Sequence, residues 1–306
     1  MKRSDILARI GVNVPEGSRL RMIVDADAKN EADDQYAIMH HLLTPLFQVE
    51  GIIGTHFEQK DGGRGESMEK SYREILKLLE LAEIEDVPAA RGCVHPLSSP
   101  EDAPDSEGVQ MLIREARRPG KLYVAVQGAM TNVAAALNRA PEIAGNLVVL
   151  WNGGGLNGRK EFNVMQDPEA VRALLRSEAE VWQTPQQVYG TLEVSLAELK
   201  RRVFPCGRLG EYLYRQLEEE NHVEYRPDFR LRSGENWTLG DNTTIAVLLM
   251  SGVRGNWHTE PAPMLGEDLI FRPDPSGRTI RVYDSIDVRM TLEDLFCKLE
   301  LAYGEK

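Results

Sequence analysis

Short apolar runs alternate along this chain with longer segments in which apolar residues recur at helical spacing. The strand-like runs lie at residues 20–24, 49–54, 87–90, 122–126 and 147–150, and helical patterns lie near 33–43, 69–82, 107–117 and 131–138. Such alternation predicts βαβ units and a mostly parallel sheet. Right-handed crossovers then gather the carboxyl ends of the strands along one edge, where open α/β sheets bind ligands.

The second half of the chain continues with helices and one further strand. Helical patterns cover 161–177, 195–220 with a break at 205–207, 241–250 and 291–302, while 279–283 alternates like a strand. Thr291 is a plausible N-cap of the last helix. We therefore expect one α/β domain over residues 1–306, with an open, mostly parallel sheet and flanking helices.

Composition narrows the classes of protein. A formal net charge of -12 argues against a nucleic-acid partner, because phosphate binding needs a clustered basic surface. Cys93, Cys206 and Cys297 are far apart and form no CxxC pair, so neither a disulfide framework nor a thiolate metal site is indicated. With no secretory signal and no long uncharged apolar segment, we expect a cytoplasmic protein that does not bind a membrane.

The end of the first predicted strand carries the strongest chemical signal. Asp25, Asp27, Asp33 and Asp34 crowd into ten residues. Ionised carboxylates held together repel one another unless a cation, protons or solvent lie between them. Oxygen ligands favour a hard ion, calcium or magnesium. The alternative is a solvated turn in which one aspartate caps the helix, which leaves the others unexplained.

Other polar segments follow later strands. Residues 127–132 follow the strand at 122–126, although Thr131 is equally good as a helix N-cap. Asp241 opens an apolar helix and could also be only a cap. Glu161 and Asn163 flank Phe162 and would point the same way if extended, a pair suited to sugar hydroxyls.

Taken together, these segments resemble the inosine-uridine-preferring nucleoside hydrolases over about residues 20–300. The family motif DxDPGxDD is similar to Asp25-Ala26-Asp27 with Asp33-Asp34, and GPLTN is similar to residues 128–132. EFN followed by DPEA is similar to residues 161–163 and 167–170, and a late aspartate at a helix start is similar to Asp241. The two extra residues around Asn30-Glu31 make the first motif closer to a divergent branch with an NExDD signature.

The resemblance implies a calcium-dependent hydrolase of N-glycosidic bonds that acts in purine or pyrimidine salvage, is cytoplasmic and forms a homodimer or homotetramer. Calcium would be held by Asp27, Asp34, the Thr131 carbonyl and Asp241, and Asp27 would take a proton from the attacking, calcium-bound water. Asp33 and Asn163 would bind ribose hydroxyls, and Glu161 would bind the 5′-hydroxyl. Asn152 or Asn157 would lie along the sugar. Asp25 would support the metal ligands from behind.

The leaving-group side of the site departs from the family. Gly240 stands before Asp241, where many members carry a histidine that protonates a purine. His56 or Glu58 falls where the family has a sugar-binding asparagine after its second strand. Trp237 is a candidate for stacking on a base, with an ordinary core position equally open, and His56 is a candidate acid.

Two other functions fit part of the sequence. A phosphatase of the haloacid-dehalogenase type would use Asp25 and Asp27 as its DxD start, but it would not need Asp33-Asp34 or the 161–163 segment. A catalytically silent nucleoside or sugar sensor that keeps the metal site would explain Gly240. Turnover of nucleosides with calcium present separates the sensor from the enzyme.

Overall fold

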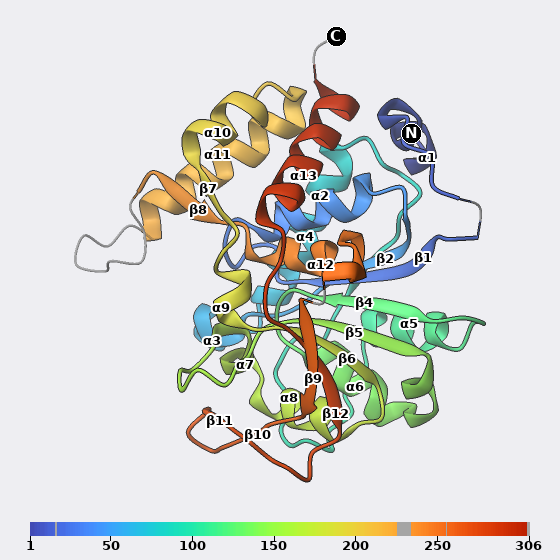
Figure 1. Cartoon of the computed structure of the whole chain (residues 1–306), viewed down its shortest axis with the longest axis vertical. Coiled ribbons are helices and arrows are strands. Elements are labelled where there is room, and N and C mark those ends of the chain that lie inside the picture. Colours follow the sequence, from blue (N-terminus) through green and yellow to red (C-terminus); the bar gives the residue numbers. More distant parts are fainter. Residues whose placement is uncertain (16, 225–233, 255, 305–306) are drawn as a thin grey trace.

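An eight-stranded sheet runs through the centre of the computed structural model, which describes residues 1–15, 17–224, 234–254 and 256–304 (Figure 1). The strand order is β3-β2-β1-β4-β5-β6-β12-β9, and only the pairing of β12 with β9 is antiparallel. The order of the chain reverses between β1 and β4, so the carboxyl ends of these two strands form a topological switch point. The strands within the described residues are β1 (Leu20–Ala26), β2 (Phe47–Gly54), β3 (Ala89–Arg91), β4 (Leu122–Val126), β5 (Leu147–Asn152), β6 (Glu180–Thr184), β7 (Glu193–Ser195), β8 (Asn236–Thr238), β9 (Trp257–Pro261), β10 (Met264–Leu265), β11 (Phe271–Arg272) and β12 (Thr279–Tyr283).

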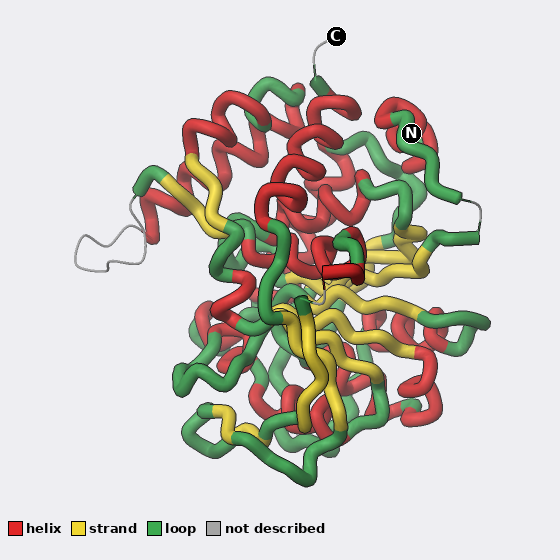
Figure 2. The backbone as a smooth tube through the Cα atoms, in the orientation of Figure 1, coloured by secondary structure: helices red, strands yellow, loops and turns green. Residues whose placement is uncertain are grey.

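Helices cover both faces of this sheet, as the red and yellow segments of Figure 2 show. Met22 and Val24 of β1 pack into one apolar core with α1, α2, α4, α11, α12 and α13, whereas Ile23 packs into a second core with α5, α6 and α8. This alternation is the period of two expected for a strand buried on both faces. The helices are α1 (Arg3–Ile10), α2 (Asp34–Leu43), α3 (Glu58–Asp61), α4 (Ser67–Leu81), α5 (Glu107–Ala116), α6 (Thr131–Arg139), η1 (Pro141–Asn146), α7 (Phe162–Gln166), α8 (Pro168–Arg176), α9 (Gln186–Tyr189), α10 (Leu196–Arg202), α11 (Gly207–Glu224), η2 (Gly240–Asn242), α12 (Thr243–Leu249), η3 (Gly252–Arg254) and α13 (Val288–Tyr303).

The predicted α/β class and mostly parallel sheet are confirmed, and two local predictions need correction. The segment 161–177 is two helices, because Asp167 leaves helical geometry and caps α8 through the Ala170 N–H. Thr291 is not an N-cap: α13 begins three residues earlier, and Asp287 accepts the Met290 N–H. The Thr291 hydroxyl instead donates to the Asp287 carbonyl from inside the first turn.

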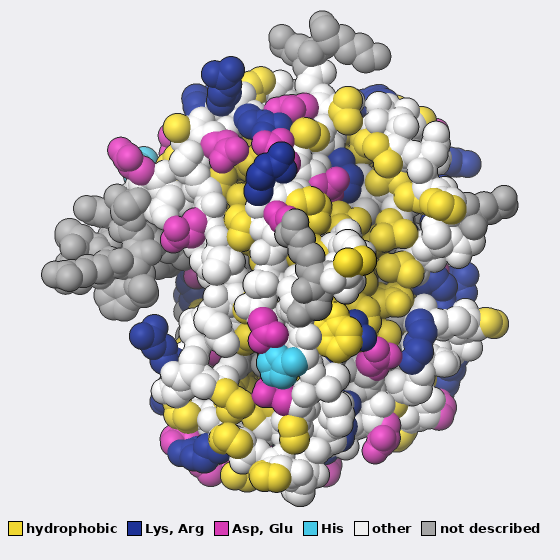
Figure 3. Space-filling model, viewed as in Figure 1, with side chains coloured by type: hydrophobic (Ala, Val, Ile, Leu, Met, Phe, Trp, Pro, Cys, Tyr) yellow, Lys and Arg dark blue, Asp and Glu magenta, His cyan; other side chains and the backbone are white. Residues whose placement is uncertain are grey.

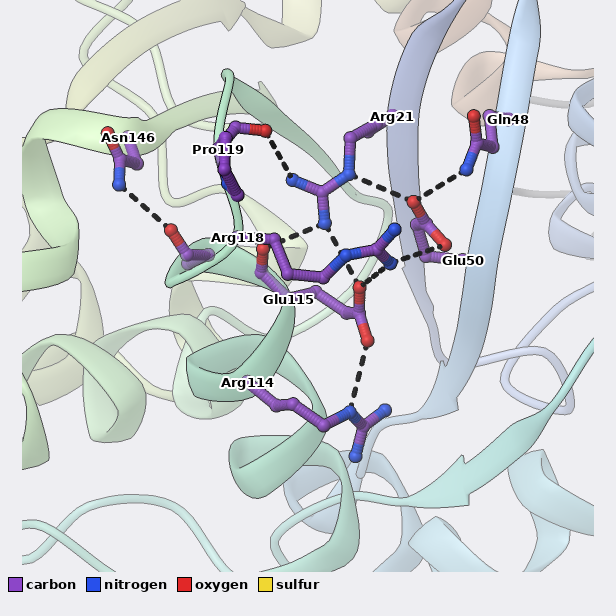
Figure 4. Close-up of polar contacts among 9 residues, drawn as sticks. Arg21, Gln48, Glu50, Arg114, Glu115, Arg118, Pro119 and Asn146 are labelled. Carbon is purple, nitrogen blue, oxygen red and sulfur yellow. Dashed lines mark hydrogen bonds and ion pairs between the residues drawn. The ribbon is translucent and has the colours of Figure 1, made fainter.

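Charged side chains tie α5 to the amino ends of β1 and β2, opposite the edge where the aspartates lie (Figure 4). Arg21 donates to Glu50 at 2.9 Å and to the Glu115 carboxylate at 3.0 Å, and Arg118 also pairs with both carboxylates. The Arg21, Glu50 and Glu115 side chains are at most 13% exposed, so these pairs are screened less than surface pairs are. This network stabilises the amino-terminal edge of the sheet, which lies opposite the candidate site.

The surface of the face in Figure 3 mixes acidic and basic side chains, with apolar side chains among them. Among the described residues, no helix combines the length and the apolar composition that crossing a lipid bilayer requires.

Candidate metal and sugar site

Segments that follow β1, β4 and β5 meet the start of α12 at the carboxyl edge of the sheet. Asp25 near the end of β1 pairs in register with Ile53 of β2 and Val126 of β4, and Asn152 is the last residue of β5. The crossovers therefore bring together polar residues that lie far apart in the sequence. This is the arrangement that the alternation of strands and helices predicted.

Three carboxylates form a compact cluster at this edge. Asp33, Asp34 and Asp241 each offer one oxygen, and these oxygens lie within 4.8 Å of one another. Asp34 and Asp241 are almost completely buried, as is the neighbouring Asp27. Asp27 Oδ2 and Asp34 Oδ1 are buried and have no hydrogen-bond partner. Buried carboxylate oxygens without donors are costly, and a hard cation satisfies them.

The electrostatics of the cluster support this interpretation. Burial, and then the neighbouring carboxylates, raise the pKa values of Asp27, Asp34 and Asp241 well above the ordinary range. Asp241 and Asp27 raise the pKa of Asp34, and Asp27 also raises the pKa of Asp241. Burial and mutual repulsion therefore favour the protonated carboxyl groups, whereas a divalent ion in the cluster would favour their ionised forms.

A glycine allows the loop after β4 to approach Asp27 closely. A Cβ on Gly128 would lie 2.7 Å from Asp27 Cγ and 2.8 Å from Thr55 Cγ2. Neither neighbour can move far, because Asp27 and Thr55 are both buried. Gly128 thus places the loop that leads into α6, and with it Thr131, next to the aspartates.

Asparagines hold two of the aspartates in place. Asn152 donates to Asp241 Oδ1 at 2.8 Å, and its own Oδ1 accepts from the Thr243 hydroxyl at 2.8 Å. Asn132 donates to Asp25 Oδ1 at 2.9 Å. Burial raises the pKa of Asp25 to about 7, although the Asn132 hydrogen bond opposes the shift. Asn152, predicted to lie along the sugar, thus contacts Asp241 directly, and Asp25 is held by Asn132.

Thr131 begins α6 and is held by its side chain. Its hydroxyl donates to Asp167 Oδ2 at 2.6 Å and lies 2.7 Å from His56 Nε2, so His56 is the donor in the second contact. Burial lowers the pKa of His56 to about 4, and the ring is therefore neutral at pH 7. A buried, neutral histidine that donates to Thr131 positions the start of α6, and it is poorly placed to act as an acid.

Glu161 and Asn163 lie side by side at the start of α7, and both are buried. The Asn163 amide donates to the carbonyls of Gln127 and Asn152, at 3.0 and 2.9 Å, which leaves its Oδ1 available as an acceptor. Glu161 accepts the N–H groups of Asn163 and Val164 and thereby caps α7. These contacts anchor α7 to the ends of β4 and β5.

Tyr189, at the end of α9, is a site residue that the sequence did not indicate. Its hydroxyl donates to Glu161 Oε1 at 2.8 Å, and a Cβ on Gly240 would lie 3.1 Å from its Cδ2. Burial, and then Glu161, raise the pKa of Tyr189, so its hydroxyl is a neutral donor. No local pattern around residues 186–189 marks this tyrosine, since only tertiary packing brings it to Gly240.

Three candidates lie outside the cluster. Trp237 is 2% exposed and packs in the first apolar core, which is the core position that the sequence left open. Burial raises the pKa of Glu58, but hydrogen bonds from Ser67 and from the Gly65 N–H outweigh this effect. The pKa of Glu58 therefore lies below its ordinary value. Asn157 is exposed, and it contacts Gln186 and the Arg159 N–H.

Comparison with known proteins agrees with the fold. The sequence profile of the inosine-uridine preferring nucleoside hydrolases matches residues 22–294, and the chain belongs to this family. This family assignment leaves the haloacid-dehalogenase alternative without support.

One curated relative is the pyrimidine-specific ribonucleoside hydrolase RihA of Salmonella paratyphi A, 27% identical over 213 residues. That alignment covers 60% of this chain and 65% of the relative, so it spans slightly less than two thirds of the curated protein.

Solved structures share the fold. A purine-preferring ribonucleoside hydrolase from Gardnerella vaginalis superposes with a TM-score of 0.72 at 23% identity, covering 92% of this chain and 99% of that chain. The type III effector protein XopQ, solved with adenosine diphosphate ribose, superposes with a TM-score of 0.66 at 16% identity, covering 99% of each chain.

Proposed function

We propose that this protein hydrolyses the N-glycosidic bond of a ribonucleoside or a related riboside and releases the base and the sugar. The observation that carries the proposal is the buried carboxylate cluster with unpartnered oxygens at the switch point of a nucleoside-hydrolase sheet. One named relative is pyrimidine-specific and another is purine-preferring, so the relatives do not indicate which base this protein would release.

Calcium is the cation that the donor set fits best. Asp27, Asp34, Asp241 and the Thr131 carbonyl would hold it, and all of these ligand atoms are hard oxygens, which calcium prefers. Asp33 belongs to the same compact cluster and would stay within reach of a sugar hydroxyl at the ion. When bound, a divalent ion lowers the pKa of water and supplies positive charge beside the reacting sugar.

The protein side chains would divide the remaining work. Asp27, with one unpartnered buried oxygen, would accept the proton of the attacking water. Asp33 and the free Oδ1 of Asn163 would bind ribose hydroxyls, and Glu161 would face the C5 end of the sugar. Asn157 would lie along the sugar, and Asn152 would orient Asp241. Carboxylates around the sugar also favour an oxocarbenium-like transition state.

Turnover and calcium binding test the proposal together. We expect the wild-type protein to hydrolyse p-nitrophenyl riboside, to lose turnover with a calcium chelator and to regain it with added calcium. Calorimetry should find one ion per chain. Asp34→Asn should weaken calcium binding at least about 100-fold. This loss exceeds the roughly 10–100-fold that is typical when a residue hydrogen-bonded to a metal ligand is replaced.

Asp268→Asn is the matched control, because Asp268 is an exposed carboxylate that pairs with Arg272. It should bind calcium as the wild type does. Turnover that is unaffected by chelation, or Asp34→Asn with wild-type calcium affinity, would contradict the metal assignment. A homodimer or homotetramer and a role in nucleoside salvage are proposed from the same family resemblance, and light scattering would measure the assembly.

A silent sensor is the second candidate, and a specific observation favours it. Gly240 has no side chain to protonate a leaving base, and His56 is buried against Thr131. A protein that binds one calcium ion and a riboside but turns over neither nucleosides nor p-nitrophenyl riboside would have this function.

A further inference from the structure

The Glu161 carboxylate is already fully hydrogen-bonded within the protein. Oε1 accepts from the Asn163 N–H at 3.2 Å and from the Tyr189 hydroxyl at 2.8 Å. Oε2 accepts from the N–H groups of Gly154 and Val164, both at 3.1 Å. A carboxylate offers about four acceptor positions, and these four donors occupy all of them.

Only one of these four donors comes from a side chain. The other three are backbone N–H groups: those of Asn163 and Val164 form the cap of α7, and that of Gly154 comes from the loop after β5. Tyr189 reaches Glu161 from α9, 28 residues away in sequence. The phenol hydroxyl therefore occupies the single acceptor position that the three backbone donors leave open.

Gly240 gives the Tyr189 ring the space for this contact. A Cβ at position 240 would lie 3.1 Å from Tyr189 Cδ2 and 3.6 Å from Asp33 Oδ2. The first distance is tight for a carbon contact, so even alanine would press on the ring. The ring thus extends from the residue beside Asp241 to the Glu161 carboxylate and forms a wall of the site.

We propose that Tyr189 is a specificity-determining residue that occupies the position on Glu161 that a sugar 5′-hydroxyl would take. The site would therefore accept ribosides whose C5 carries no free hydroxyl about as well as those that carry one. The inference rests on the proposed function, in which Glu161 faces the C5 end of the sugar. A 5′-hydroxyl would meet only the neutral phenol oxygen, and a neutral hydrogen bond is about half as strong as one to a carboxylate.

Two ligand pairs that differ by one oxygen atom test this inference. The first pair is methyl β-D-ribofuranoside and its 5-deoxy analogue, whose dissociation constants are measured by calorimetry with calcium present. The second pair is p-nitrophenyl β-D-ribofuranoside and its 5-deoxy analogue, compared by kcat/KM. The wild-type protein should distinguish the members of each pair by less than about threefold, since only a neutral hydrogen bond is at stake.

Tyr189→Phe keeps the ring over Gly240 and removes only the hydroxyl. It frees one acceptor position on Glu161, and the variant should then favour the 5-hydroxy member of each pair by at least about tenfold, as expected for a hydrogen bond to a charged group. Tyr212→Phe is the matched control, because the Tyr212 hydroxyl donates to Glu74 at a different site. It should keep the wild-type preference.

The outcomes separate this inference from the proposed activity. A wild-type preference of tenfold or more for the 5-hydroxy ligand, or an unchanged preference in Tyr189→Phe, would overturn the role of Tyr189. Failure of the wild type to bind either methyl riboside would overturn it too. If neither nitrophenyl riboside is hydrolysed but the binding preference shifts as described, the role of Tyr189 stands and the proposed hydrolysis fails.

Discussion

Asn152 donates a hydrogen bond to Asp241 Oδ1 at 2.8 Å, which joins the end of β5 to the start of the helix that carries the last carboxylate of the cluster. The Oδ1 atom of the same side chain accepts from the hydroxyl of Thr243, two residues after Asp241. Asn152 thus fixes the carboxylate at its edge of the sheet, so Asp241 meets Asp34 with one oxygen already occupied.

Replacing Asn152 with alanine should weaken calcium binding. The change removes the donor to Asp241 and leaves the Thr243 hydroxyl without its 2.8 Å acceptor. Residues that orient metal ligands typically contribute about 10–100-fold to affinity, and we expect a loss of that size by calorimetry. Asn146→Ala is the control, because the Asn146 side chain donates to the Ala116 carbonyl just before β5, at the opposite end of that strand from Asn152 (Figure 4). Wild-type affinity in Asn152→Ala would show that Asp241 needs no support.

Asp27→Asn should abolish hydrolysis while the fold survives. A neutral amide can remain beside the ion, but it cannot accept the proton of the attacking water. General-base catalysis typically contributes about 10²–10⁴-fold, and a loss in kcat of this size is expected with calcium saturating. Thermal unfolding of the variant checks the fold. A loss smaller than about tenfold would assign the base to another group.

The leaving group should decide which ribosides are cleaved quickly. Gly240 supplies no side chain, His56 is neutral and donates to Thr131, and Trp237 is buried in the core. A leaving base that must be protonated therefore lacks general acid catalysis, which typically raises the rate about 10²–10⁴-fold. By contrast, p-nitrophenolate leaves without a proton. We expect kcat/KM for p-nitrophenyl riboside to exceed that for inosine and uridine by at least about 100-fold. Equal and efficient turnover of inosine would reveal a competent acid.

The calcium-free protein should lose stability as the pH rises, in part because of Asp25. Burial raises the pKa of Asp25 to about 7, against an unfolded value of about 3.9. The folded state then binds the proton more tightly, so this contribution is complete below about pH 4 and is lost as the pH rises through about 7.

Asp25→Asn removes this titration and keeps an acceptor for Asn132. We expect the free energy of unfolding of the wild type, relative to the variant, to fall by on the order of 4 kcal/mol between pH 4 and 8. Urea unfolding at several pH values, with chelator present, measures the difference. A difference that does not change with pH would show that Asp25 ionises normally in the fold.

Local patterns in the sequence were enough to predict the framework of the site. A short apolar run predicted β4 and an alternating pattern predicted β12, both with their observed bounds. The clustering of Asp25, Asp27, Asp33 and Asp34 after the first strand also indicated a cation site, because carboxylate repulsion depends on charge and proximity along the chain. Helix ends were less certain: the cap at Asp287 instead of Thr291 depends on one side-chain hydrogen bond.

Tertiary structure decided the roles of the individual side chains. His56 could not be distinguished from an exposed acid until burial and the contact with Thr131 showed it to be neutral. Tyr189 carries no motif, and it belongs to the site because α9 packs against η2 at Gly240. Periodicity and local charge are properties of neighbouring residues, so the sequence itself determines the order of elements and the acidic cluster. Hydrogen bonds and desolvation depend on residues brought together from distant segments, and therefore only the packed structure assigned donors, acceptors and protonation states at the site.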